Sequence, residues 1–167
     1  MLHIIFLQTA LRLWAQETKI DKSGVCMFPS HLFPILLVYY AKSLPCPVLP
    51  SSGDFDLIDK GWVSGNKMSP AELWIDFFCF YSLNFKKESE VVRIDLVEKC
   101  ERFVNLPGFF TVVDPFSLDK NLWSEPGRSD ELEECIRKAC VYFLDPLNDH
   151  FTVYTYLFHH FPMPLTV

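Results

Sequence analysis

Asp54 and Asp56, in the segment SGDFD at residues 52–56, have a spacing that could serve metal chemistry. Paired carboxylates can hold divalent ions that align a hydroxyl group with a phosphate. A pair used in this way is expected at the end of a strand, but these two aspartates follow a proline-rich loop at residues 43–50. We therefore interpret them as part of a solvated loop.

The stretch VVDPFSLDKNL, residues 112–122, combines the end of an apolar strand with a proline and several polar side chains. The β-branched run stops at Asp114, and a polar turn that contains Lys120 and Asn121 follows. One interpretation is purely structural, with Asp114 capping a turn and Phe116 in the core. The alternative is that the side chains of this turn point into a binding cleft.

The cysteines carry no metal-binding pattern. They stand at positions 26, 46, 79, 100, 135 and 140, with no CxxC pair and no zinc-knuckle spacing. Cys79 and Cys140 lie in apolar runs, where a thiol usually serves as a small buried hydrophobe. We expect all six thiols to be reduced, as in a cytoplasmic or nuclear protein.

Composition predicts about one domain with a well-filled core, since half of the 167 residues are hydrophobic. The net charge is −6, and the 15 lysines and arginines are scattered. Phosphate binding needs clustered basic residues, so this chain alone is not expected to bind nucleic acid through its phosphates. The apolar run 32–41 is about half the length of a membrane span, and no basic region precedes the apolar N-terminus, so no membrane or targeting segment is expected.

The elements that position these residues are mainly helical, with a small antiparallel β element of the α+β class. Helices are predicted over residues 4–18, from about Pro29 to Lys42 with a distortion at Pro34, and from about Ser129 onward. The β-prone stretches 91–94 and 109–113 predict two strands of one small sheet.

The clearest helix start is at Ser69-Pro70-Ala71-Glu72. Serine at the N-cap, proline at the first position and glutamate at the third form a capping box with a proline suited to the first turn. We expect one helical domain over residues 1–144. Residues 145–167 form an aromatic-rich tail that we leave unassigned.

Four segments now stand in order: LRLWAQETKID, FPSHLFPILLVYYAKSLPCPVLP, MSPAELWIDFFCFYSLNF and VVDPFSLDKNL. This series resembles the helical central domain, with its PAP-associated segment, of the poly(A) polymerases and terminal uridylyltransferases. The zinc-knuckle uridylyltransferases are the most similar group. The resemblance covers about residues 7–144, and it implies that the stretch 112–122 closes over the base of an incoming UTP.

The resemblance implies a nucleotide pocket that has changed. Its vestigial nucleotide-binding residues are Arg12, Ser30, His31, Asp114, Lys120 and Asn121. Gln16 stands where the family has a second cation for the triphosphate, His31 where it often has a tyrosine that stacks on uracil, and Lys120 where many members have a histidine. In the family, Mg or Mn is bound by a separate catalytic domain with Gly-Ser and Asp-x-Asp motifs. This chain has neither motif in the expected place, so no catalytic or metal-binding residue is expected.

Three interpretations follow. The first is a partial uridylyltransferase chain that acts as a non-catalytic module for RNA or RNA-binding proteins. The second is the C-terminal half of an active RNA uridylyltransferase or poly(A) polymerase, with the catalytic domain supplied in cis by upstream sequence. The third is an unrelated helical interaction domain, which would be favoured if the predicted strands failed to pair. Without a catalytic domain, Ile4, Ile5 and Phe6 are expected to face water. The chain is then expected to self-associate or to need a partner.

Overall fold

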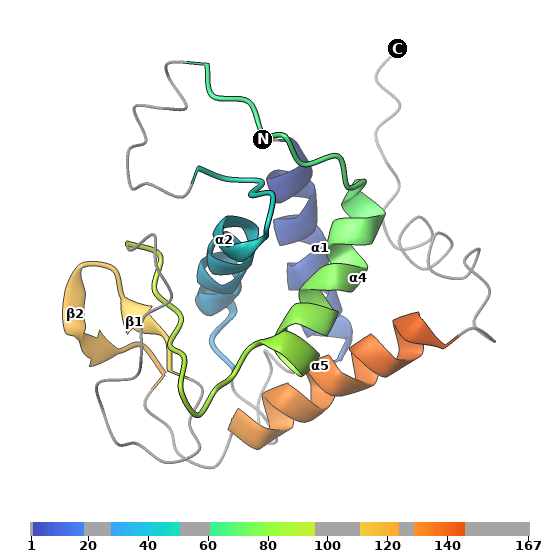
Figure 1. The fold of residues 1–167 in the computed structure, drawn as a ribbon. Helices are drawn as coiled ribbons and strands as arrows, with labels where there is room; N and C mark the ends of the chain where they lie inside the picture. The colour runs from blue at the N-terminus through green and yellow to red at the C-terminus, as the bar shows by residue number, and fades with distance from the viewer. Residues whose placement is uncertain (1, 19–27, 51–60, 96–110, 124–128, 146–167) are drawn as a thin grey trace.

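The computed structural model describes residues 2–18, 28–50, 61–95, 111–123 and 129–145 (Figure 1). Most of this part of the chain is helical, and the sheet within it has two antiparallel strands. In chain order the elements are α1 (Leu2–Glu17), a 3-10 turn (Ser30–Leu32), α2 (Phe33–Ser43), α4 (Pro70–Cys79), a π turn (Phe80–Asn84), β1 (Val113–Asp114), β2 (Ser117–Asn121) and α5 (Ser129–Leu144). The predicted fold class is confirmed.

The second predicted helix is divided in two. Pro29 has extended backbone angles, and a single 3-10 turn, Ser30–Leu32, leads into α2. Pro34 then lies in the first turn of α2. Backbone N–H groups of a first turn have no carbonyl partner within the helix, so proline breaks no hydrogen bond there. The distortion expected near Pro34 is therefore a change of helix type just before it, and α2 itself begins at Phe33.

The start of α4 is the predicted capping box. The Ser69 hydroxyl accepts a hydrogen bond from the Glu72 N–H at 3.3 Å, and the Glu72 carboxylate accepts one from the Ser69 N–H at 2.6 Å. Pro70 occupies the first turn. Two N–H groups that a helix start would leave without partners are thus satisfied by side chains.

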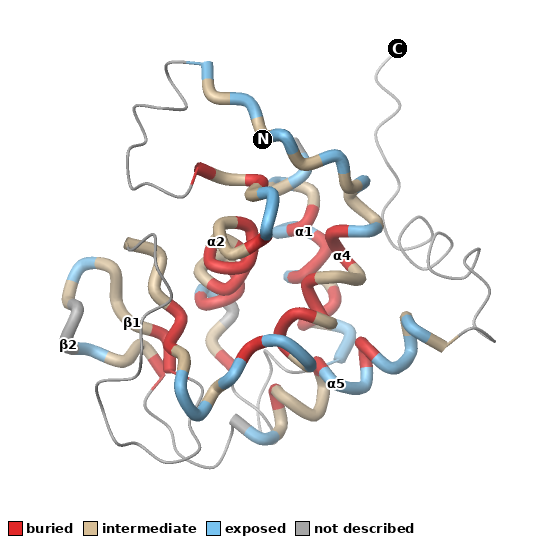
Figure 2. Tube along the Cα trace, in the orientation of Figure 1, coloured by how far each residue is buried: buried red, intermediate tan, exposed pale blue. Residues whose placement is uncertain are grey.

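The core lies between α1, α2 and α4, and Figure 2 shows buried positions along all three helices. Its largest fully buried side chains include Trp74, Tyr40, Phe28, Phe77 and Phe78. Burial of such rings contributes about 1.5–3 kcal/mol each relative to exposure, so these aromatic side chains dominate the packing. α5 packs on α4 and on the π turn with the stripe Leu132, Ile136 and Cys140.

The prediction of the strands was wrong in its details. Val113–Asp114 pairs with Ser117–Asn121 in an antiparallel hairpin, so the polar residues after Pro115 form a strand and not a turn. The stretch 91–94 contributes only an isolated parallel bridge between Val92 and Val112. Part of the other predicted strand, residues 109–110, lies outside the described residues.

The physical reason is the short turn at Pro115 and Phe116, which returns the chain directly alongside β1. The sequence Ser-Leu-Asp-Lys-Asn is poor in β-branched and aromatic residues, so intrinsic preference does not reveal β2. Hydrogen bonds from Val92 N to Thr111 O (2.9 Å) and from Val113 N to Val92 O (3.0 Å) still join the two predicted stretches. The two predicted stretches therefore pair. A failure of this pairing would have favoured the interpretation as an unrelated helical domain.

The N-terminal helix exposes part of its apolar surface. Ile5 is 58% exposed, whereas Ile4 and Phe6 are half-buried. Exposure of this face, predicted for the chain without a catalytic domain, is thus confirmed for Ile5. The tail 146–167 lies outside the described residues. Among the helices of the described ranges, none has the length and apolar character needed to cross a membrane.

We expect Ser69→Ala to lower the free energy of unfolding by about 0.5–2 kcal/mol, because the N–H of Glu72 loses its acceptor at the helix start. Urea unfolding followed by circular dichroism measures the change. Glu72→Gln is the matched control, since an amide oxygen can still accept from the Ser69 N–H and should preserve most of the stability. Equal losses in the two variants would contradict a capping role for the serine hydroxyl.

Candidate functional site

The hairpin uses two of the candidate site residues to build itself. The Asp114 Oδ1 atom accepts a hydrogen bond from the Phe116 N–H at 2.8 Å, which closes the turn. The Asn121 Oδ1 atom accepts from the N–H groups of Val112 at 3.0 Å and Trp123 at 3.1 Å. These contacts hold both ends of the hairpin, so the prediction that Asp114 caps a turn is confirmed.

The other candidates lie on different elements, and three of their side chains face solvent. Arg12 on α1, His31 in the 3-10 turn and Lys120 on β2 are exposed. Gln16, one turn after Arg12, is half-buried. Ser30 begins the 3-10 turn, but its side chain is outside the described set. No hydrogen bond or ion pair between described atoms joins any two of these candidates, so their convergence into one pocket stays a prediction.

Aromatic contacts connect the elements that carry these residues. Trp14 meets Phe33 with ring centroids 6.3 Å apart, Phe33 meets Phe28 at 4.8 Å, and Phe28 meets Trp123 at 4.9 Å. Each contact is edge-on, the geometry that aromatic pairs prefer. The continuous path fixes α1, the entrance of α2 and the end of the hairpin relative to one another. His31 lies between two members of the path, Phe28 and Phe33, in sequence.

Phe116 is a residue that the sequence interpretation misplaced. The purely structural interpretation of this stretch places Phe116 in the core, but its side chain is 94% exposed at the tip of the hairpin. The available signal was its position directly after Asp-Pro, because the central residues of a tight turn point outward. The hairpin therefore presents an unburied aromatic ring and the exposed ammonium group of Lys120 on the same short element.

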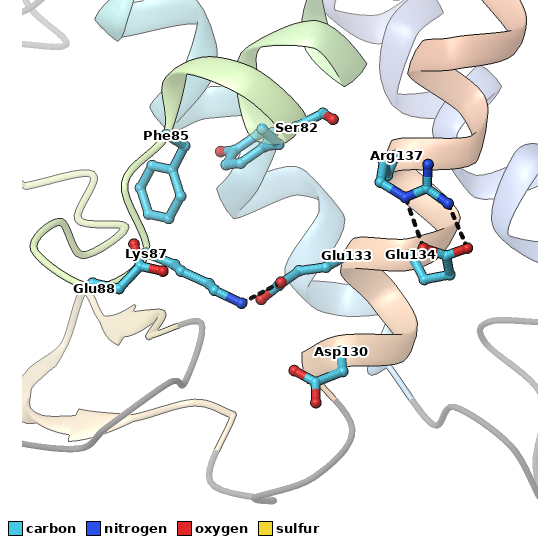
Figure 3. A pocket seen from close by; sticks show the side chains of 9 residues that line it. Ser82, Phe85, Lys87, Glu88, Asp130, Glu133, Glu134 and Arg137 are labelled. Atoms are coloured by element: carbon cyan, nitrogen blue, oxygen red, sulfur yellow. Dashed lines mark hydrogen bonds and ion pairs between the residues drawn. The ribbon is translucent and has the colours of Figure 1, made fainter.

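A separate cavity of about 370 Å³ lies between the π turn and the first half of α5 (Figure 3). The residues that line it are Tyr81, Ser82, Phe85, Lys87, Glu88, Asp130, Glu133, Glu134 and Arg137. None of the six candidate nucleotide-binding residues is among them.

Charge makes this cavity a poor nucleotide site. Lys87 pairs with Glu133, and the Arg137 guanidinium donates to both oxygens of Glu134 at 2.7 and 2.8 Å (Figure 3). Hydrogen bonding to Arg137 lowers the pKa of Glu134 to about 2, and hydrogen bonding to Glu133 raises the pKa of Lys87. Both cations are thus paired with carboxylates of the cavity wall. The wall as a whole carries four carboxylates and two cations. A triphosphate would meet net repulsion there.

The described ranges hold no cluster of possible metal ligands. Within them, no three histidine, cysteine, aspartate or glutamate side chains cluster closely enough to hold a metal ion. Asp54 and Asp56 lie outside the described residues, so their assignment to a solvated loop stays a prediction. The described residues therefore include no group of three carboxylates of the kind that two-metal catalysis uses.

Comparison with known proteins gives a distant relative in sequence. No family model matches the chain. The chain is similar to the Schizosaccharomyces pombe caffeine-induced protein 16, with 25% identity over 67% of this chain and 12% of the relative. The chain thus spans about an eighth of the length of that protein.

Comparison with solved structures gives a much broader match. A structure of Cid1 in complex with the UTP analogue UMPNPP has a TM-score of 0.72 over 92% of this chain, at 16% identity. A cytoplasmic RNA terminal U-transferase has a TM-score of 0.74 over 98%, at 18% identity, and a variant of mtPAP in complex with ATPγS has 0.70 over 96%, at 14%. The chain covers 58%, 58% and 38% of those structures. At these identities the match shows a shared fold.

We expect Asn121→Ala to lower the free energy of unfolding by about 1–3 kcal/mol, because two backbone N–H groups lose their acceptor. Urea unfolding measures the change. The neighbouring Lys120→Ala is the control, since this exposed side chain should contribute within about 0.5 kcal/mol. A larger loss for Lys120→Ala than for Asn121→Ala would show that the hairpin is not held by the asparagine.

Proposed function

We propose that this chain is the helical central region of a protein of the terminal uridylyltransferase and poly(A) polymerase group. Its role is that of a non-catalytic module that recognises RNA or an RNA-binding protein. The fold shared with two such enzymes over 92% and 98% of the chain supports the proposal. The assignment to the zinc-knuckle type and a cytoplasmic or nuclear location belong to the same proposal.

The observation that carries the proposal is the hairpin tip. A phenylalanine that is 94% exposed is costly to leave in water and has a flat face on which a base can stack. Lys120 on the same hairpin can donate to a base oxygen. The internal hydrogen bonds of Asp114 and Asn121 hold this tip in one shape, so the ring is presented on a rigid support.

Charge restricts the way in which RNA can bind. The net charge of −6 and the scattered cations do not supply a phosphate-binding surface. Contact should therefore depend on a few unstacked bases, as in single-stranded RNA, with little release of counterions. A partner protein that supplies the phosphate contacts would complete such a module.

The nucleotide pocket implied by the family resemblance is vestigial in this proposal. Its residues would be Arg12, Ser30, His31, Asp114, Lys120 and Asn121. Gln16 is neutral and cannot replace a cation beside a triphosphate, so UTP should bind weakly. Each lost charge-assisted contact costs on the order of 1.5–3 kcal/mol, or about ten- to a hundred-fold in affinity.

A second candidate is the C-terminal part of an active enzyme. Two of the solved structures that share the fold contain nucleotide analogues, and this chain covers 58% and 38% of their length. In that case Mg or Mn and UTP would be held largely by a catalytic domain in cis. The two candidates differ in whether upstream sequence encodes the Gly-Ser and Asp-x-Asp motifs.

Phe116→Ala should weaken the binding of a fluorescent uridine-rich RNA by roughly five- to a hundred-fold, because loss of stacking costs roughly 1–3 kcal/mol per base. Fluorescence anisotropy at several salt concentrations measures affinity and salt dependence, which should be shallow. Leu83→Ala, at an apolar side chain that is 67% exposed on the π turn, is the matched control. Equal effects of the two substitutions would remove the hairpin tip as the contact.

The chain alone should not extend RNA. The described residues offer no group of three carboxylates for metal ions, without which a 3′ hydroxyl and a triphosphate are not aligned. Incubation with an RNA oligonucleotide, Mg or Mn and each labelled nucleotide tests this on a sequencing gel. Template-independent extension that persists after replacement of both Asp54 and Asp56 by alanine would reveal a catalytic site elsewhere and contradict the expectation.

A further inference from the structure

Two cysteine thiols face each other across the contact between α4 and α5. Cys79 is the last residue of α4, and Cys140 belongs to the buried stripe of α5. The Cys140 thiol donates to the Cys79 sulfur, with the two Sγ atoms 3.4 Å apart. Cys140 is only 2% exposed, whereas Cys79 is half-buried and can be reached from solvent.

The other described cysteines differ from this pair. Cys46 is exposed in the loop after α2, and Cys135 is half-buried on α5 beside Trp14 and Thr18. Cys135 and Cys140 both lie on α5, yet Cys140 is the one in contact with the Cys79 thiol. The chain thus offers close internal controls for any reaction of the pair.

The position of the pair matters because α5 depends on this contact. Among the described elements, α5 packs mainly on α4 and the π turn, through Leu132, Ile136 and Cys140. A helix held chiefly on one side is a candidate for local opening without unfolding of the rest. A covalent bond across the same contact would suppress that opening.

We propose that Cys79 and Cys140 are an oxidisable dithiol that crosslinks α5 to α4 when the chain meets hydrogen peroxide or glutathione disulfide. With peroxide, the Cys79 sulfur first gains oxygen to become a sulfenic acid, and one water leaves. The Cys140 sulfur then displaces the sulfenic oxygen as a second water and forms the disulfide. The thiols lose two electrons and two protons in total, and the peroxide is reduced to two waters. With glutathione disulfide, the Cys79 sulfur displaces one glutathione as its thiol, and the Cys140 sulfur then displaces the second, so the oxidant is reduced to two glutathione thiols.

The dithiol is the resting form. Burial, with a smaller contribution from the neighbouring Cys140 thiol, raises the pKa of Cys79 to about 12. The thiolate is the reactive species, so at neutral pH the pair reacts slowly and responds to sustained or strong oxidation. The partners are 61 positions apart, and the loop between them contains the hairpin. The crosslink would therefore restrain the segment that the proposed function assigns to RNA contact.

The test uses the full chain, first reduced and then treated with graded hydrogen peroxide or glutathione disulfide. Peptide mapping by mass spectrometry should find a Cys79–Cys140 crosslink within one chain, reversed by dithiothreitol. The thermal midpoint should rise by about 5–15 °C, because the closed loop restricts the unfolded state. Amide hydrogen exchange should slow more in α5 than in α1 or α2.

Cys79→Ser and Cys140→Ser should each abolish the crosslink and the thermal shift, whereas Cys135→Ser should retain both. Oxidation confined to Cys46 or Cys135, with no internal crosslink, would overturn the proposal. A crosslink that forms without selective protection of α5 would overturn its role at this contact. Neither result depends on RNA binding, so a failure here is distinct from a failure of the proposed function.

Discussion

Two buried tyrosine hydroxyls join α2 to α4 and to the π turn that follows α4, and the rest of the fold depends on this connection. Tyr40 donates to the Asp76 carboxylate at 2.8 Å, and Tyr81 donates to the Leu36 carbonyl at 2.7 Å. Burial raises the pKa of both tyrosines, so they remain neutral donors. A buried hydroxyl without a partner costs about 1–3 kcal/mol, so a shift of α2 relative to α4 and the π turn would lose these bonds and that free energy together. Phe28, just before α2, then contacts Trp123 at the end of the hairpin, and α5 packs on α4.

In the proposed function, a structural role and a binding role share one short segment, the hairpin. Asp114 and Asn121 direct oxygens to backbone N–H groups, whereas Phe116 and Lys120 extend away from the scaffold. Because the polar residues that define the shape are distinct from those that face solvent, the tip can change in sequence without loss of the turn. The negative net charge of the chain is consistent with such a local mode of contact.

Local signals in the sequence predicted those parts of the fold that local interactions decide. The Ser69–Glu72 capping box and the start of α5 near Ser129 involve neighbours in sequence, and both are present. The strand Ser117–Asn121 was missed because its pairing is set by the turn and by the Asn121 side chain and not by β propensity. Ring contacts such as Phe28 with Trp123 join residues far apart in the chain, and no periodicity reveals them. For the same reason, the sequence could name candidate site residues but could not show whether they meet.

The π turn at the end of α4 has a consequence for the alignment of this chain with other sequences of the same fold. Phe85 N–H donates to the Phe80 carbonyl at 2.8 Å, five positions back, where a regular α-helix would bond four back. Such a widened turn accommodates one additional residue in a helix without breaking it. Removal of a single residue between Phe80 and Phe85 would restore regular helical spacing at this end of the helix. A sequence of the same fold that is one residue shorter here should therefore be aligned with a gap inside this turn.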